Sequence, residues 1–114
     1  MTLQSDTDVQ GAFRALADPT RRGILLFLSE KDMTIGEVAG HFEMTRPAVK
    51  KHLVILEEGN LISTRQRGRE VVNRLEPDGL KQAADWLSIF DRFWDTRLAA
   101  LKHAVETEEG EDNG

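Results

Sequence analysis

The sequence contains no cysteine. A chain without cysteine forms no disulfide bond. It also has no thiolate to act as a catalytic nucleophile or to bind zinc, copper or an iron–sulfur cluster. These classes of site are therefore excluded. The missing cysteines do not by themselves indicate a cellular compartment.

Long hydrophobic runs are missing as well. No apolar stretch approaches the roughly 18 residues that a membrane-spanning helix needs. Residues 1–6 lack the basic and apolar segments that begin a secretory signal. We therefore expect no membrane partner and a location in the cytoplasm.

The signatures of common enzymes are also absent. The sequence has no Gly-rich phosphate loop, no nucleophile turn with Ser, His and Asp, and no carboxylate pair framed by apolar residues. Glu57 and Glu58 are adjacent acids, but we expect them at the exposed end of a helix as surface charge. The chain is predicted not to be an enzyme and to need no cofactor.

Positive charge is scarce overall but concentrated in one segment. The chain has 15 Lys and Arg against 20 Asp and Glu, a net charge of −5. Residues 106–114 contain five acids and no base, and residues 107–114 are predicted to form an acidic disordered tail. Residues 45–74, in contrast, contain seven bases and three acids. A basic middle in a body that is otherwise acidic points to a surface that binds an anion.

The rest of the sequence is a succession of helix signals. The length suits one domain, predicted over residues 1–106. Apolar residues at helical spacing predict a helix over residues 8–17. Asp18 and Pro19 then fit the N-cap and first position of a second helix, which ends near Ser29.

Two further helices follow, each with a capping residue at its start. Thr34 and Glu37 form a Thr-x-x-Glu capping box for a short helix. Thr45 caps the next helix, which has Pro47 in its first turn and Gly59 as a C′ glycine at its end. The short connection, and the basic residues expected outside on the second helix, are typical of a helix-turn-helix.

Beyond these helices the apolar period changes to that of strands. Residues 61–66 and 70–75 are strand-like, and Gly68 supplies the tight turn of a hairpin between them. A long helix is expected over residues 78–105. It carries more large apolar surface than one side of a small domain needs, so we predict that it also packs on a second subunit.

Four stretches of the sequence resemble the ArsR family of bacterial winged-helix repressors. They are residues 13–22, 34–39, 44–53 and 56–62, and the resemblance extends over roughly residues 8–106. It implies a mainly α fold with a β-hairpin wing, in the order α-α-α-α-β-β-α. It also implies a homodimer, formed through the terminal helices, that represses transcription from a palindromic operator. In this family a ligand, usually a metal, releases the DNA.

The resemblance and the charge pattern together predict which residues meet double-stranded DNA. Arg46 and Lys50 are expected at base edges or nearby phosphates of the major groove. His52 either touches a phosphate or bonds within the motif. The alternative for the basic residues is a solvated face without a ligand. The full predicted set is Thr45, Arg46, Pro47, Lys50, Lys51 and His52 on the recognition helix, and Arg67 and Arg69 on the wing.

The first and last helices are predicted to form the dimer contact. Dimerisation through both helices is what the family resemblance implies. The predicted residues are Val9, Phe13, Leu87, Phe90, Trp94, Leu98 and Leu101.

Metal sensing is the family property that this sequence does not match. Residues 36–40 hold no cysteine for a thiolate site. Asp85 is followed by Leu87 where a sensor site on the last helix would have histidine. His103 and Glu106 remain as a pair at i, i+3 spacing, but a tetrahedral site needs three or four ligands. We therefore predict a cysteine-free, metal-independent subgroup with no metal ligands.

Two other functions stay open at this stage. Trp86, Phe90, Phe93 and Trp94 would line a cavity for an apolar small-molecule effector that releases the DNA, although core packing is the commoner explanation for aromatic residues at this spacing. Alternatively, the winged helix is a scaffold for binding another protein. The basic segment 45–74 speaks against the second alternative.

Overall fold

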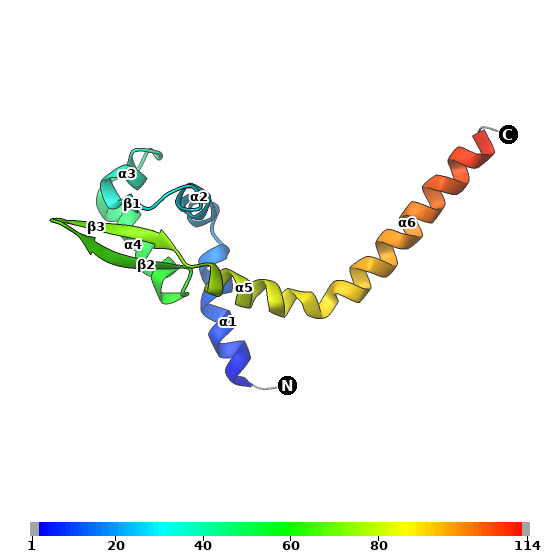
Figure 1. The fold of residues 1–114 in the computed structure, drawn as a ribbon, viewed down its shortest axis with the longest axis horizontal. Coiled ribbons are helices and arrows are strands. Elements are labelled where there is room, and N and C mark those ends of the chain that lie inside the picture. Colours follow the sequence, from blue (N-terminus) through cyan, green and yellow to red (C-terminus); the bar gives the residue numbers. More distant parts are fainter. Residues whose placement is uncertain (1–2, 113–114) are drawn as a thin grey trace. The chain divides into compact units, whose positions relative to one another are not determined.

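The computed structural model describes the backbone of residues 3–112 and the side chains of residues 9–95 and 97–106. The predicted fold class is confirmed, because the described elements are mainly helical and include one β-hairpin (Figure 1). Among the described helices, none is long and apolar enough to cross a membrane.

Four helices and most of a fifth, α5 (Pro77–Leu87), enclose the core of the first compact unit, Met1–Ala84. The largest fully buried side chains of this unit include Ile24 of α2, Val38 of α3, Leu56 of α4 and Val72 of the sheet. The core therefore draws on every part of the predicted helix-turn-helix and its wing. The helices are α1 (Leu3–Leu16), α2 (Pro19–Leu28), α3 (Ile35–Ala39) and α4 (Arg46–Glu58).

The predicted caps begin α2 and α3 in the structure. The Asp18 carboxylate accepts a hydrogen bond from the backbone N–H of Arg21 at 3.1 Å. At α3 the capping box is complete, because Thr34 Oγ1 accepts from Glu37 N while Glu37 Oε1 accepts from Thr34 N. Each cap satisfies N–H groups that have no partner inside the helix.

The end of α4 differs from the prediction in one detail. Gly59 is the C-cap with φ −82°, and Asn60 is the left-handed C′ residue with φ 61°. Asn60 N donates to Glu57 O, and Leu61 N donates to Leu56 O, which is the Schellman pattern. Glycine is needed at position 59 for another reason: a Cβ there would lie 2.6 Å from the carbonyl oxygen of Gly11 in α1.

A three-stranded antiparallel sheet in the order β1-β3-β2 completes the first unit. Its strands are β1 (Met33–Thr34), β2 (Ile62–Arg67) and β3 (Glu70–Leu75). The β2–β3 hairpin is the predicted wing, whereas the two-residue β1 is too short to show a period in the sequence. Asn73 is buried on β3 and donates to Met33 O at 3.2 Å, which holds β1 against the wing.

The second compact unit, Asp85–Gly114, starts within the last turn of α5 (Pro77–Leu87). The single long helix expected over residues 78–105 is interrupted by a short 3₁₀ segment, Ser88–Phe90. Ser88 Oγ donates to Asp85 O at 2.5 Å. Such back-bonding competes with helical hydrogen bonds and bends helices, and 3₁₀ turns mark these interruptions.

Helix α6 (Asp91–Asp112) follows the interruption. Its backbone stays helical beyond residue 106, where the sequence predicts a disordered tail. The side chains of residues 107–112 and all of residues 113–114 lie outside the described part of the chain. The contacts divide the chain into Met1–Ala84 and Asp85–Gly114, and the predicted domain boundary at residue 106 stays a prediction.

Candidate nucleic-acid interface

Helix α4 presents a basic face opposite its buried face. Val49, Leu53 and Leu56 are buried in the core. The side chains of Arg46, Lys50 and Lys51 are exposed, and within the described part of the chain none of them forms a hydrogen bond or ion pair. We call Arg46, Lys50 and Lys51 the α4 basic face. Positive charges without a protein partner are available to an anion such as a phosphate.

The start of α4 is set by Thr45 and Pro47. Thr45 has extended backbone angles, and its Oγ1 accepts from Ala48 N at 3.3 Å. Pro47 lies in the first turn, where its missing N–H costs no helical hydrogen bond. Both residues therefore fix where the helix starts, and Thr45 keeps its hydroxyl proton to donate elsewhere.

The wing carries a second group of arginines on one face. Arg65 is paired with Val72, Arg67 with Glu70 and Ser63 with Arg74, and directly paired residues share a face of the sheet. Arg65, Arg67 and Arg74 therefore lie on the same side of the hairpin. Gly68 provides its tip with φ 64°, and no atom lies within 4 Å of a Cβ built there.

The two predicted wing arginines differ in their surroundings. Arg67 Nη2 lies 3.6 Å from Glu70 Oε2, so its charge is partly compensated across the turn. Arg69 is exposed, and within the described part of the chain it has no hydrogen bond or ion pair. Arg65, which the sequence analysis did not select, is paired with Asp32 at 3.3 Å. Of the two predicted wing arginines, Arg69 therefore has the charge that is more available to an anion.

His52 faces a polar junction rather than open solvent. Its Nδ1 lies 3.3 Å from Arg21 Nη1 and 3.9 Å from Asp18 Oδ2, and its side chain is 19% exposed. This geometry favours the second of its two predicted roles, a bond within the motif. Its contact with a phosphate stays a prediction.

Arg21 links three helices at this junction, which the sequence analysis did not foresee. Its Nε donates to Ala15 O at 2.8 Å and its Nη2 to Arg14 O at 2.9 Å, both in the last turns of α1. Arg22 Nη1 donates to Leu16 O at 2.8 Å in the same way. The final carbonyls of a helix have no internal partner. The sequence signal for these contacts was therefore the presence of two arginines shortly after the end of a helix.

The hydrogen bond from the backbone of Arg21 is the main reason that the pKa of Asp18 lies below its usual value. The charges of Arg21 and His52 lower the pKa of Asp18 further, against partial burial, which raises it. Asp18 therefore stays ionised beside Arg21 at neutral pH. The carboxylate and the guanidinium together hold the start of α2 against α1 and α4.

The predicted dimer residues fall into two groups. Val9 is buried within its own unit, and Phe13 is half-buried against the core. In the second unit Leu87, Phe90 and Trp94 are 51%, 42% and 56% exposed. Leu98 and Leu101 are each 62% exposed. Among the predicted dimer residues, those with exposed apolar side chains therefore lie in the second unit, and the dimer contact stays a prediction.

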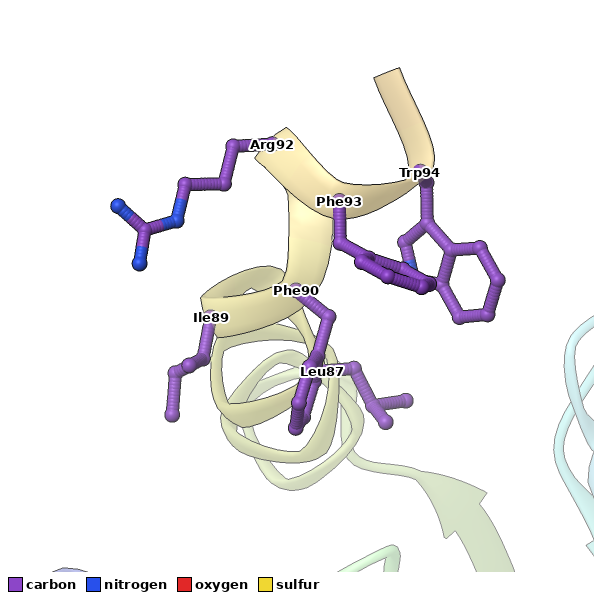
Figure 2. Close-up of a pocket in the computed structure, with 6 residues that line it drawn as sticks. All are labelled: Leu87, Ile89, Phe90, Arg92, Phe93 and Trp94. Atoms are coloured by element: carbon purple, nitrogen blue, oxygen red, sulfur yellow. The ribbon is translucent and has the colours of Figure 1, made fainter. Parts of the chain in front are cut away.

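An open pocket of about 670 Å³ lies on this second unit. Phe93 and Trp94 pack edge to face with centroids 5.4 Å apart, and Figure 2 shows Arg92 pointing away from both rings. The pocket is lined by Leu87, Ile89, Phe90, Arg92, Phe93 and Trp94.

In the part of the chain that the structure describes, no group of three or more His, Asp or Glu side chains is placed to hold a metal ion. Glu106, one member of the pair at i, i+3 spacing, has a cationic neighbour, because Lys102 Nζ lies 4.0 Å from Glu106 Oε1.

Comparison with known proteins gives a consistent result for the first unit. The model of a family described as bacterial regulatory protein, arsR family, matches residues 18–64. These residues extend from the cap of α2 through the α4 basic face into β2.

Individual relatives match over most of their length. The chain is 37% identical over 101 residues to the HTH-type transcriptional regulator Rv2034 of Mycobacterium tuberculosis, covering 89% of this chain and 91% of that protein. It is 35% identical over 82 residues to the transcriptional repressor SdpR of Bacillus subtilis, covering 72% and 91%. A solved ArsR-like transcriptional regulator from Rhodococcus sp. RHA1 is 32% identical with a TM-score of 0.72, covering 88% and 94%.

Proposed function

The chain belongs to the ArsR family of bacterial regulatory proteins and is a DNA-binding transcriptional repressor, and we propose that it acts as a homodimer on a palindromic operator. We further propose that it needs no metal to bind this DNA. The observation that carries the DNA-binding part is the α4 basic face. Three exposed cations lie on a helix whose opposite face is locked into the core.

The α4 basic face is suited to the major groove. In a helix-turn-helix the first residues of the recognition helix contact base edges. Arg46 occupies that position and Lys50 lies one turn further on, so both are assigned to base edges or adjacent phosphates. Thr45 and Lys51 are assigned to phosphates. Arg69, with Arg67 beside it, extends the contact from the wing into the minor groove or to its phosphates.

The homodimer rests on the exposed apolar side chains of the second unit. Phe90 at the end of the 3₁₀ segment and four residues of α6 are between 42% and 62% exposed, namely Trp94, Leu98, Leu101 and Val105. A contiguous apolar surface of this kind on a small protein marks an interaction site. A second copy covers it with the same residues, because a two-fold interface uses one patch twice. Two-fold symmetry in the protein in turn requires a palindrome in the DNA.

Metal independence rests on the available donor atoms. The sequence holds no cysteine, and Leu87 stands two residues after Asp85. His103 and Glu106 supply one ligand pair, which is short of the three or four ligands of a structural or sensor zinc site.

The acidic C-terminal residues are assigned an electrostatic role. Residues 106–114 carry five of the twenty acids, so they supply the whole net charge of −5. Negative charge repels arbitrary DNA and leaves discrimination to the α4 basic face. Deleting residues 107–114 is therefore expected to raise the affinity for random duplex more than the affinity for the operator.

Selection of bound duplexes from a random pool, with and without EDTA, tests the proposal. We expect an enriched inverted repeat whose half-sites are about 34 Å apart, and the same repeat in both arms. No enrichment would refute sequence-specific binding. Enrichment of a single half-site would refute the homodimer, and loss of enrichment with EDTA would refute metal independence.

A further inference from the structure

The side chain of Arg46 rests on a glycine of the preceding helix. A Cβ built on Gly36 in α3 would lie 2.7 Å from Arg46 Nη2, 3.2 Å from Cζ and 3.8 Å from Nε. The guanidinium group of the first residue of α4 therefore occupies the space that a side chain at position 36 would fill. No hydrogen bond or ion pair ties this guanidinium to the other residues that the structure describes.

The backbone itself does not require glycine at position 36. Among the described glycines, the one with a positive φ is Gly68 in the wing. Gly36 lies near the start of a five-residue helix, where glycine is a poorer helix former than alanine. Helix α3 thus carries an unfavourable residue at the position that leaves room for Arg46.

Gly40 at the end of α3 is a useful contrast. A Cβ built there would meet Glu37 O at 3.4 Å and Gly36 O at 3.6 Å, which is ordinary contact. Gly40 has right-handed helical angles, so alanine fits its backbone as well. Gly36 lies within α3 and Gly40 is its C-cap, and of these two glycines only Gly36 contacts the recognition helix through Arg46.

We propose that Gly36 is a specificity-determining residue: by leaving space for the Arg46 guanidinium, it sets the direction in which Arg46 presents its donors to a base pair. This inference rests on the proposed function and adds to it a residue outside the recognition helix. Arginine reads guanine through two parallel hydrogen bonds, which require a fixed position and plane of the guanidinium. A long side chain that is already held in place also loses less conformational entropy on binding.

The consequence is that a single methyl group on α3 changes base recognition without disturbing the fold. In Gly36→Ala, the flexible end of Arg46 moves away while the backbone stays in place. Helix α3 keeps its capping box, because Thr34 and Glu37 are unchanged. Thermal stability is expected to be equal or slightly higher, because alanine is the better helix former.

The test measures binding by fluorescence anisotropy to the operator obtained by selection, and to a set of single-base-pair variants of it. Wild type, Gly36→Ala, Gly40→Ala, Arg46→Ala and the double variant of Gly36→Ala with Arg46→Ala are compared. We expect Gly36→Ala to bind the operator roughly tenfold more weakly and to lose discrimination at the base pair where Arg46→Ala loses it. Gly40→Ala should behave as wild type.

The double-mutant cycle separates a direct effect on Arg46 from a general effect on α3. Gly36→Ala should change nothing further when Arg46 is already alanine. Full discrimination by Gly36→Ala at the Arg46-dependent base pair, or an undiminished loss in the Arg46→Ala background, would overturn the inference while leaving the proposed function intact. Should wild type itself fail to distinguish any sequence from random duplex, the proposed function fails and the inference with it. Gly36→Ser, which adds a Cβ at the same place, repeats the measurement independently.

Discussion

The two compact units differ in how far they bury their large apolar side chains. In Met1–Ala84, Ile24 and Leu56 are fully buried, and the core is completed by one chain. In the second unit, Leu98 and Leu101 leave 62% of their surface exposed. The first unit therefore has the burial that a stable domain needs, whereas the second has a surface that burial against another chain would stabilise. DNA reading and subunit association are thus assigned to different parts of the sequence.

The largest effect is expected when exposed apolar side chains of α6 become charged. We expect Leu98→Glu combined with Leu101→Glu to give a monomer by analytical ultracentrifugation. Its affinity for the palindrome should fall by about 10²–10⁴, because the two half-sites are no longer linked. Lys102→Glu changes the charge by the same amount on the same helix and should stay dimeric. A doubly substituted protein that still sediments as a dimer would show that these two leucines are not at the interface.

Truncation of one leucine in each unit is expected to have very different effects on stability. Leu56→Ala removes a fully buried side chain and should lower the free energy of unfolding of the first unit by about 2–5 kcal/mol. Leu101→Ala should change it by less than about 0.5 kcal/mol, as for other exposed sites. Urea unfolding at a protein concentration too low for dimers measures both. Equal losses would mean that Leu101 is buried against its own chain.

The elements of the first unit were predictable because their signals are local. Asp18, Thr34 and Thr45 each cap a helix that starts at the next residue. Gly68 takes the positive φ that a tight hairpin turn requires. In these cases the residue and the backbone that it controls lie within three or four positions of each other.

The features that the sequence did not reveal depend on residues far apart in the chain. Position 59 requires glycine because Gly11 in another helix approaches it closely. The residues next to Gly59 in the sequence therefore gave no sign that Asn60, and not Gly59, has the left-handed backbone conformation. Strand β1 exists through its pairing with β3. The interruption at Ser88 does have a local cause. A serine inside a helix either bonds back to the preceding turn or points to solvent, so the sequence alone did not predict the interruption.

The candidate site also combines features that local sequence predicts with features that depend on packing between distant residues. The exposed cations of α4 follow from helical periodicity alone. The contact of Arg46 with Gly36 and the bridge from Arg21 to His52 require the helices to be packed first. The pairing of Arg65 with Asp32 likewise joins the wing to a distant loop.

Removing one charge from each unit gives a smaller effect that tests where the DNA lies. Lys51→Gln should weaken binding similarly for all sequences and should reduce the slope of log K against log salt by about 0.9 if Lys51 meets one phosphate. Lys102→Gln removes the same charge from α6 and should leave the slope unchanged. Measurements between 50 and 200 mM salt suffice. A reduced slope in the α6 variant instead would place phosphate contacts on the second unit.

The smallest expected effect concerns pH and is confined to the first unit. The hydrogen bond from Arg21 N holds the pKa of Asp18 below its usual value in the folded protein. At acidic pH the unfolded chain therefore binds more protons than the folded one. The stability that Asp18 contributes is fully present above the usual aspartate pKa, about 3.9, and is lost as the pH falls from there through the lower folded value. In Asp18→Asn the amide oxygen still caps α2 but does not titrate, so the free energy of unfolding should depend less steeply on pH below about 4. Urea unfolding of the first unit, followed by circular dichroism between neutral pH and pH 3, measures this slope. An unchanged slope in Asp18→Asn would show that the carboxylate contributes nothing to the junction of α1, α2 and α4 beyond its role as a cap.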